Sequence, residues 1–353
     1  MNGKIRRNMY CVFGLMIVIG VGFLVMDFYF SNFIVPKRFF KDLIYYPSEA
    51  NETKKIYHRQ SINLTDGKNT FHMDLNRFRA EYSYMQDYKC KVNISNPEMC
   101  STPKSSKLLL IATNSYPNSF AKRLALRRAY AKRQQIKDYL VVTVFMLAMT
   151  HDKKMMELVG IESRQHGDII MWDFEEHRAN LTLKISCLLE WLNNECTSAD
   201  FFVKADDDEF VNPEAIVKHI SDDRNTTRFI SGYVYRHDKV YREGRNKVSR
   251  NLFPDNIYPD FPSGGGYMVP RSFIPELYRK SKTLPVFPVD DVFMGFMALA
   301  SNVPLKHEER FYVWGLEYSV QLYKGAFVVH SLAAEKVIEM WEKLQKEKKK
   351  ETV

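Results

Sequence analysis

Three consecutive aspartates, Asp206, Asp207 and Asp208, directly follow the apolar segment Phe201–Ala205. Adjacent carboxylates repel one another, so a triplet at the end of a buried strand indicates a counter-ion. The side chains of Asp206 and Asp208 point to the same side of an extended chain and could hold one divalent cation. Oxygen ligands suit Mg²⁺ or Mn²⁺ and leave positions open for phosphate oxygens. A solvated acidic turn before a helix that begins near Pro213 is the alternative, but the position at a strand end favours the metal site.

Two further groups of reactive side chains lie downstream. Asp290 and Asp291 form an acidic pair within the apolar segment Phe287–Gly295. They are either a helix N-cap with its neighbour or a functional base, and the residues alone do not decide between these interpretations. His330 ends the apolar run Ala326–Val329. A lone histidine of this kind is more often structural than a metal ligand.

A glycine triplet, Gly264, Gly265 and Gly266, stands between the two acidic groups and is followed by Tyr267. Glycine lets a backbone approach a ligand closely, so we expect a turn that faces a ligand here. The spacing is not GxGxxG, and no helical pattern follows at once. A dinucleotide-binding fingerprint is therefore disfavoured.

Alternating strands and helices must position these groups. Continuous apolar runs predict strands buried on both faces, and apolar residues at helical spacing predict the helices between them. The expected strands are Leu108–Thr113, Tyr139–Ala148, Asp168–Trp172, Phe201–Ala205 and Phe229–Tyr235, and the expected helices are Ala121–Gln135, Lys153–Ser163, Asn180–Asn193 and Pro213–Ile220. This alternation predicts an α/β fold with a mostly parallel sheet and helices on both faces. Such sheets bind ligands at the carboxyl ends of their strands, which is where the aspartate triplet lies.

The apolar segment over residues 9–26 carries no charge and predicts a transmembrane signal anchor. A helix of this length spans about 27 Å, close to the hydrocarbon core of a bilayer. A buried soluble helix would show a polar stripe, and a cleavable signal peptide would end in small residues, whereas Asp27-Phe28-Tyr29-Phe30 follow here. Basic residues within 1–8 favour a cytoplasmic tail, so the rest of the chain is expected in a secretory lumen.

Sequons and cysteines are compatible with that orientation. Asn-X-Ser/Thr tripeptides, each weak evidence alone, stand at Asn51, Asn63, Asn93, Asn180 and Asn225. Beyond the apolar segment, the cysteines that could form two disulfides are Cys90, Cys100, Cys187 and Cys196. We expect local pairing, Cys90 with Cys100 and Cys187 with Cys196. Free buried thiols are the alternative.

Composition and periodicity suggest the remaining boundaries. Residues 27–105 show no sustained period and predict a luminal stem, with a catalytic domain over 106–345 and a basic tail over 346–353. In 353 residues, 45% hydrophobic and 26% charged side chains exclude a collagen-like or fully disordered chain. Much of the net charge of +9 lies in basic runs near both ends, which are usually solvated, so we expect no nucleic-acid partner.

The motifs, taken in order, resemble the blocks of glycosyltransferase family 31, the β-1,3-galactosyl- and β-1,3-N-acetylglucosaminyltransferases. The resemblance covers roughly residues 107–331. Its blocks are Arg123–Tyr130, Asp173–Phe174, Asn180–Lys184, Lys204–Phe210, Tyr258–Met268 and Asp290–Gly295. Each block is weak alone, but the ordered set is specific. The chain departs from the family pattern at Ala129 and Tyr130, where Thr and Trp are usual, at Asp290, where Glu is usual, and at Pro262 and Gly265.

The resemblance implies a type II Golgi membrane protein with a GT-A-like, Rossmann-type luminal domain. It implies inverting transfer of galactose or N-acetylglucosamine from UDP-galactose or UDP-N-acetylglucosamine to a glycan of a glycoprotein or glycolipid, forming a β-1,3 linkage. The implied cofactor is Mn²⁺, with Mg²⁺ as an alternative. The implied roles are metal ligation by Asp208, Asp206 and His330, nucleotide-sugar contact by Arg127, Lys204, Asp206 and Asp207, sugar contact by Gly265, Gly266 and Tyr267, and base catalysis by Asp291 with its neighbour Asp290.

Two other classes of protein share some of these features. A luminal glycan-binding relative would keep the fold and lose the chemistry, and intact Asp208 and Asp291 argue against it. A metal-dependent phosphodiester hydrolase also uses clustered aspartates, but the anchor and the sequons disfavour it. The sequence leaves open whether the chain forms homo- or hetero-oligomers.

Overall fold

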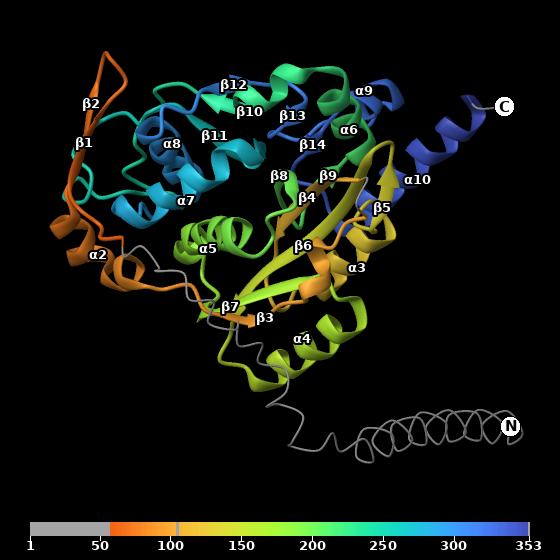
Figure 1. Cartoon of the computed structure of the whole chain (residues 1–353), viewed down its shortest axis with the longest axis horizontal. Helices are drawn as coiled ribbons and strands as arrows, with labels where there is room; N and C mark the ends of the chain where they lie inside the picture. The colour runs from red at the N-terminus through yellow and green to blue at the C-terminus, as the bar shows by residue number, and fades with distance from the viewer. Residues whose placement is uncertain (1–56, 104–105, 352–353) are drawn as a thin grey trace, which may run out of the picture. The chain divides into compact units, whose positions relative to one another are not determined.

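A nine-stranded sheet runs through the part of the chain that the computed structural model describes, residues 57–103 and 106–351 (Figure 1). In spatial order its strands are β12 (Leu305–His307), β10 (Ile230–Tyr235), β11 (Phe261–Pro270), β8 (Ala199–Asp206), β4 (Lys107–Asn114), β6 (Tyr139–Met149), β7 (Ile169–Glu175) and β3 (Val92–Ile94), and β5 (Gln134–Ile136) pairs with β6. A second sheet holds β13 (Phe311–Tyr312), β14 (Val328–Val329) and β9 (Phe210–Val211). The predicted anchor over residues 9–26 and Asn51 lie outside the described residues. Within the described ranges, no helix is long and apolar enough to cross a membrane.

The centre of the large sheet is parallel. Strands β8, β4, β6 and β7 run parallel to one another, whereas β11 joins β8 in the antiparallel sense and β3 joins β7 likewise. The register places Asn114 of β4 beside Met146 of β6 and Asp206 of β8, so β4 and β8 end together and β6 continues to Met149. The prediction of an α/β fold with a mostly parallel central sheet is confirmed.

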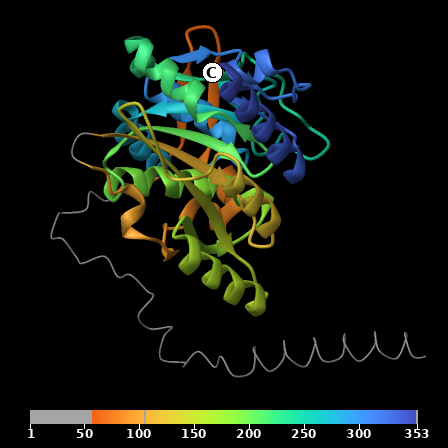
Figure 2. The ribbon, with the colours of Figure 1, turned by 90° about the vertical axis from the view of Figure 1, so that its right-hand side faces the viewer.

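Helices cover both faces because side chains alternate along each strand. In β4, Leu108, Leu110 and Ala112 enter one core, and Leu109 and Ile111 enter the other. The first core is closed by α5 (Leu181–Asn194), α7 (Ile274–Thr283) and α8 (Asp290–Ala300). The second is closed by α3 (Phe120–Arg128), α4 (Lys153–His166), α6 (Pro213–Asp222) and α10 (Ala334–Glu351), with α9 (Val320–Gly325) nearby. Helix α10 packs beside α3 (Figure 2).

Two sequence expectations about local structure are wrong. The helix expected over Ala121–Gln135 ends at Arg128, because the chain turns to pair β5 with β6. The glycine triplet is not a turn but part of β11, which pairs with β8 through Tyr267 and with β10 through Tyr235. Its glycines lie within this strand, at the register shift of its pairing with β10.

Much of the segment expected to be stem is folded against the domain. It forms the hairpin β1 (Ile62–Thr65) and β2 (Thr70–Met73), helix α2 (Leu75–Asp87) and strand β3. The Arg59 guanidinium donates to the carbonyls of Ser281 and Leu284, each at 2.6 Å. At the other end, residues 346–351 of the expected basic tail continue α10. The folded unit is thus wider than the expected range of 106–345, because isolated polar helices and short strands leave little periodic signal.

Both disulfides join the N-terminal segment to helix α5 or its end. Cys90 is bonded to Cys187, and Cys100 is bonded to Cys196. The expectation of local pairing is wrong, whereas the four cysteines are disulfide-bonded as proposed. Strand β3 lies at the sheet edge beside β7 between Cys90 and Cys100, which carries the two cysteines past α5. Each bridge therefore closes a long loop, with sequence separations of 97 and 96 residues.

We predict that peptide mapping without reduction recovers Cys90 linked to Cys187 and Cys100 linked to Cys196. The double substitution Cys100→Ser/Cys196→Ser should lower the free energy of unfolding by about 3 kcal/mol, since with Cys90–Cys187 intact it releases a closed loop of roughly 20 residues in the unfolded chain. Urea denaturation measures this against the wild-type domain. Recovery of a Cys90–Cys100 peptide would contradict the observed connectivity.

Candidate active site

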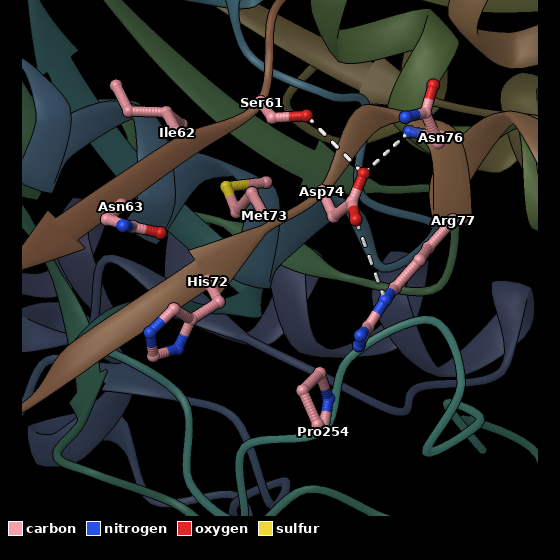
Figure 3. Close-up of a pocket in the computed structure, with 9 residues that line it drawn as sticks. All are labelled: Ser61, Ile62, Asn63, His72, Met73, Asp74, Asn76, Arg77 and Pro254. Carbon is pink, nitrogen blue, oxygen red and sulfur yellow. Dashed lines mark hydrogen bonds and ion pairs between the residues drawn. The ribbon is translucent and has the colours of Figure 1, made fainter.

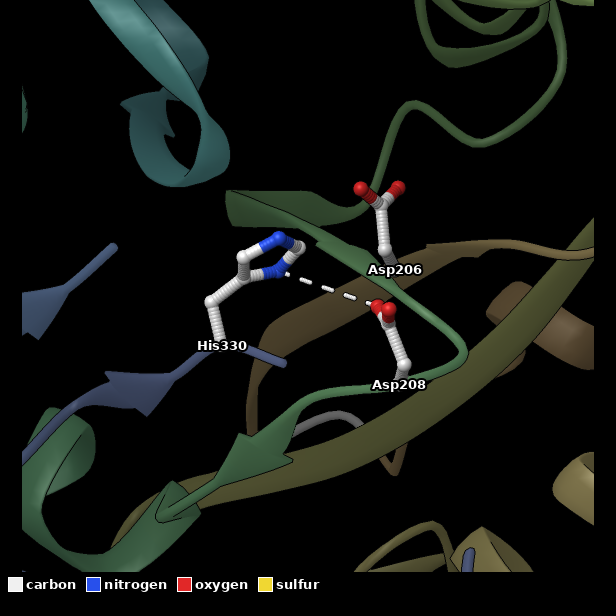
Figure 4. Close-up of side chains that lie close together, drawn as sticks. All are labelled: Asp206, Asp208 and His330. Carbon is white, nitrogen blue, oxygen red and sulfur yellow. Dashed lines mark ion pairs between the residues drawn. The ribbon is translucent and has the colours of Figure 1, made fainter. Parts of the chain in front are cut away.

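The carboxyl end of β8 brings two acidic side chains and one histidine together. Asp206 ends β8 and Asp208 follows in the turn, while His330 comes directly after β14. Ligand atoms of the three residues lie within 4.8 Å of one another (Figure 4). The antiparallel pairing of Val329 with Phe210 places His330 beside the acidic turn, although the two are far apart in the sequence. Two carboxylates suit Mn²⁺ or Mg²⁺, and the imidazole beside them favours Mn²⁺ over the harder Mg²⁺.

Glu209 contacts two residues of this group, and the sequence did not indicate this role. Its side chain is fully buried, accepts the backbone N–H of Asp206 at 2.8 Å, and lies 3.0 Å from Nδ1 of His330. Burial raises the pKa of Glu209 to about 7, although the hydrogen bond from His330 acts in the opposite direction. That hydrogen bond raises the pKa of His330. Nδ1 of His330 also lies 3.7 Å from Oδ1 of Asp208, so the ring faces the acidic turn.

Lys204 is a buried cation between the two acidic groups. Its ammonium donates to Asp206 at 2.8 Å and to the backbone carbonyl of Gly264. Burial alone would lower the pKa of Lys204, but the carboxylates of Asp206, Glu209 and Asp290 raise it above its ordinary value. Lys204 therefore stays charged and offsets the crowding of carboxylates at this strand end.

Asp290 and Asp291 are the first two residues of α8, with Val289 as the N-cap. Acidic residues are stabilised at this end of a helix by its dipole. Asp291 accepts the backbone N–H of Val292 at 2.8 Å and that of Gly264 at 3.2 Å. Burial, and next the charge of Asp290, raise the pKa of Asp291 to about 7. The pair thus opens a helix and also has the proton affinity of a base, so the two interpretations are compatible.

The glycine triplet serves packing more than ligand approach. A side chain at Gly265 would meet Val313 at 3.1 Å, and one at Gly266, whose φ is +112°, would meet Phe311 at 3.1 Å. Only Gly264 faces the acidic pair, where a Cβ would lie 3.4 Å from Asp291. Tyr267 is buried against Phe202, and its hydroxyl has no hydrogen-bond partner among the described residues.

Asp207 and Arg127 form hydrogen bonds and ion pairs with other side chains of the protein. Asp207 accepts from Ser115 at 2.8 Å and from Lys122 at 2.7 Å, so it does not join Asp206 and Asp208. Arg127 binds Glu162 and Asp168, each through bonds of 2.6–2.7 Å. Two of the four residues expected to contact the nucleotide-sugar, Asp207 and Arg127, are thus engaged in ion pairs within the protein.

Comparison with known proteins identifies the family. A family model described as galactosyltransferase matches residues 121–309. Human β-1,3-galactosyltransferase 5 is 31% identical over 67% of this chain and 78% of its own. A mouse N-acetyllactosaminide β-1,3-N-acetylglucosaminyltransferase 2 is 27% identical over 76% of this chain and 70% of its own. The chain belongs to the galactosyltransferase family.

Among solved structures, the apo form of the bifunctional glycosyltransferase WbbM is 11% identical, with a TM-score of 0.39, over 68% of this chain and 50% of that one. A likeness this low does not identify a shared fold. The family match itself contains Lys204, the aspartate triplet and the acidic pair of α8, whereas His330 lies beyond its last residue.

One departure from the family pattern has a structural role in this galactosyltransferase-family domain. Tyr130, where the resemblance led us to expect Trp, is fully buried and donates its hydroxyl to the backbone carbonyl of Glu209 at 3.1 Å. Ala129 is the C-cap of α3, where the chain leaves the helix. Tyr130 therefore holds the turn that carries Glu209. A Trp ring, whose one donor is its Nε1–H, could not donate this hydrogen bond in the same geometry.

A cavity of about 550 Å³ lies away from these residues, between the β1–β2 hairpin and the start of α2 (Figure 3). Asp74 there caps α2 and pairs with Arg77, so its charge already serves the fold. Among the described sequons, Asn63 in this cavity and Asn225 are exposed. The side-chain amide of Asn93 donates a hydrogen bond to the sulfur of Met149, and that of Asn180 donates to the carbonyl of Glu175.

Lys184, the last residue of the block Asn180–Lys184, forms hydrogen bonds with the end of β4 and with β6. Its buried ammonium donates to Asn114, to the carbonyls of Ser115 and Met146, and pairs with Glu176 at 2.8 Å. Burial lowers its pKa, with the charge of Glu176 acting in the opposite direction. Lys184 thus anchors the loop that leads from β4 into the site.

We predict that Lys184→Met lowers the free energy of unfolding by about 4 kcal/mol, because it leaves the buried Glu176 carboxylate unpaired. Adding Glu176→Gln should recover part of this loss, since the remaining side chain is neutral. Urea denaturation of the two variants and the wild type measures both effects. Equal stability of the single and double variants would contradict the ion pair.

Proposed function

We propose that this chain transfers a hexose, galactose or N-acetylglucosamine, from a UDP-sugar to a sugar hydroxyl and forms a β-1,3 linkage on a glycoprotein or glycolipid glycan. The observation that carries the proposal is the pairing of two acidic groups across Gly264. Lys204 donates both to Asp206 and to the carbonyl of Gly264, and Asp291 accepts the N–H of Gly264. Donor-binding and proton-accepting groups therefore stand on either side of one short strand segment, in a chain of the galactosyltransferase family.

The donor side consists of Asp206, Asp208 and His330. Their convergence within 4.8 Å fits a divalent cation, and the buried Glu209 orients His330 for ligation. When bound, Mn²⁺ or Mg²⁺ offsets the negative charge that develops on a departing diphosphate. The chain's own part is to hold the ligands: Glu209 fixes the backbone of Asp206 and the ring of His330, and Lys204 neutralises the carboxylate of Asp206 that faces it.

The acceptor side is assigned to Asp291. An α-linked donor becomes a β-linked product by one in-line displacement, which requires a single base to take the proton of the attacking hydroxyl. A carboxyl with a pKa of about 7 is ionised in a large fraction of molecules near neutral pH and holds the abstracted proton well. The backbone N–H groups of Val292 and Gly264 fix its oxygens. Inversion needs no covalent enzyme intermediate.

The names of the relatives support both donor sugars. One relative is a β-1,3-galactosyltransferase, and another is a β-1,3-N-acetylglucosaminyltransferase. A panel of UDP-sugars with simple β-linked acceptors, with the product linkage assigned by NMR, identifies the donor. UDP-sugar hydrolysis and transfer both absent with Mn²⁺ would favour the glycan-binding alternative.

We further propose that the protein is a single-pass type II protein of the Golgi membrane, with this domain in the lumen. The uncharged segment over residues 9–26 and the sequons that follow it support this placement. The partners are then a luminal glycan acceptor and, through the N-terminal segment, the membrane, with no nucleic acid. Fluorescence microscopy of the tagged full chain, with protease protection, tests the orientation.

Two substitutions separate the proposed roles. Asp208→Ala should abolish Mn²⁺-dependent binding of UDP, measured by calorimetry with and without the cation. Asp291→Asn should retain UDP binding but lower transfer by about 10³-fold, because the hydroxyl proton has no acceptor. Glu214→Gln, at a half-buried residue of α6 that pairs with Lys348 of α10, is the control and should leave both unchanged. Near-normal transfer by Asp291→Asn would remove the base assignment.

The rate should depend on pH through Asp291. Below about pH 7 its carboxyl is protonated and cannot accept a proton, so kcat/KM should rise with pH and level off above about pH 8. Asp290→Asn removes a like charge, lowers the pKa of Asp291, and should move this rise to lower pH. Initial rates over about pH 5 to 9 with saturating Mn²⁺ measure both profiles. An unmoved inflection in Asp290→Asn would contradict the coupling.

A further inference from the structure

Trp314 is exposed to an unusual degree. Its side chain is 76% exposed, more than any other large hydrophobic residue that the structure describes. The remaining tryptophans, Trp172, Trp191 and Trp341, are buried or partly buried. An indole is the largest apolar side chain with a polar tip, and it gains most when a ligand covers its face. An isolated, exposed indole beside a candidate active site is therefore a candidate contact for a ligand.

The backbone on both sides of Trp314 is fixed against the site. Val313 is buried and lies 3.1 Å from the Cβ position of Gly265 in β11. Gly315 adopts a φ of +80°, and its Cβ position is 3.4 Å from the backbone carbonyl of His330. A larger residue at position 315 would be strained by this φ. Trp314 is thus held between the central strand of the site and the segment that carries His330.

A row of aromatic rings leads from Trp314 to helix α8. The Trp314 ring meets Tyr235 edge to face, with centroids 6.3 Å apart. Tyr235 stacks on Phe261, with centroids 5.2 Å apart. Burial, followed by the charges of Tyr233 and Asp291, raises the pKa of Tyr235 to about 12, with a hydrogen bond to Ser263 acting in the opposite direction. Phe261 in turn packs against α8, where a Cβ at Gly295 would lie 2.5 Å from the Phe261 Cβ. The indole therefore lies at the end of an aromatic row that reaches the helix whose first turn carries Asp291.

We propose that Trp314 is the stacking platform for the pyranose ring of the acceptor, a neutral β-linked hexopyranoside whose hydroxyl is attacked at the donor. This inference rests on the proposed function and names a binding site for its second substrate. The C–H groups on one face of such a ring carry partial positive charge and suit the negative face of an indole. The carboxylates of Asp290 and Asp291 nearby disfavour an acidic sugar. Phe261 is buried and Tyr233 and Tyr235 are half-buried, so Trp314 is the one open ring of this aromatic group, which fits a single sugar more closely than a protein surface.

Trp314→Ala should raise the acceptor KM about tenfold, equivalent to the upper range of an aromatic contact, while the KM for the UDP-sugar changes less than twofold. Trp314→Phe keeps a π face and should stay within about threefold of the wild type. The acceptors used are methyl β-galactoside and methyl β-N-acetylglucosaminide. Tyr84→Ala, at a 52% exposed tyrosine in α2, is the matched control and should match the wild type.

Outcomes of this experiment distinguish three cases. An unchanged acceptor KM in Trp314→Ala, with an active wild type, would overturn the platform and leave the proposed function standing. A rise in the UDP-sugar KM alone would overturn it as well, because the indole would then serve the donor. A wild type that transfers no sugar from any UDP-sugar would reject the proposed function instead.

Binding of the acceptor can be read without turnover. Acrylamide quenching of tryptophan fluorescence reports chiefly on Trp314, since it is the most exposed of the tryptophans. Adding the methyl glycoside in the presence of UDP and Mn²⁺ should reduce quenching in the wild type and in Tyr84→Ala. Trp314→Phe should show no such protection. Unprotected fluorescence in the wild type at saturating acceptor would overturn the proposal, whether or not transfer is detected.

Discussion

A single buried ammonium holds the candidate active site together. Lys204 lies between Asp206 and the backbone of Gly264, and the negative charges of Glu209 and Asp290 also act on it. Carboxylates this close repel each other strongly in a medium of low polarity, so the acidic strand end is stable only with a cation inside it. The strand that supplies Lys204 also supplies Asp206, so charge and counter-charge are placed by one short sequence.

The same crowding determines the strength of the proposed base. Desolvation and the neighbouring carboxylate of Asp290 push the pKa of Asp291 upward, while two backbone N–H groups limit the rise. A carboxyl in water would be a weak proton acceptor near neutral pH, whereas one with a pKa near 7 is matched to the task. The position at the start of α8 adds a helix dipole that favours the ionised form. Catalytic potential therefore arises from an arrangement that is costly for the fold.

The sequence predicted the parts of this molecule that depend on local pattern. Apolar runs located the central strands, and the aspartate triplet after Phe201–Ala205 indicated the site, because strand ends in a parallel sheet gather ligands. What it missed depends on contacts between distant segments. The partners of Cys90 and Cys100 follow from β3 joining the sheet edge, and the role of Glu209 follows from β9 pairing with β14. A fourth acidic residue in a row was the available signal for Glu209, yet it does not distinguish a buried support from a solvated charge.

The glycine segment shows how one misplaced element changes an interpretation. As a turn, its glycines would have been free to approach a sugar, but as the interior of β11 they let Val313 and Phe311 pack onto the strand. That close packing brings the β13 loop down onto β11 and leaves the next side chain, Trp314, facing outward. Small residues in the strand thus create the place for an aromatic ring above it. The glycine pattern suggested a contact with a sugar at the glycines themselves. Because of this packing, the proposed contact lies instead at Trp314, which is not part of that pattern.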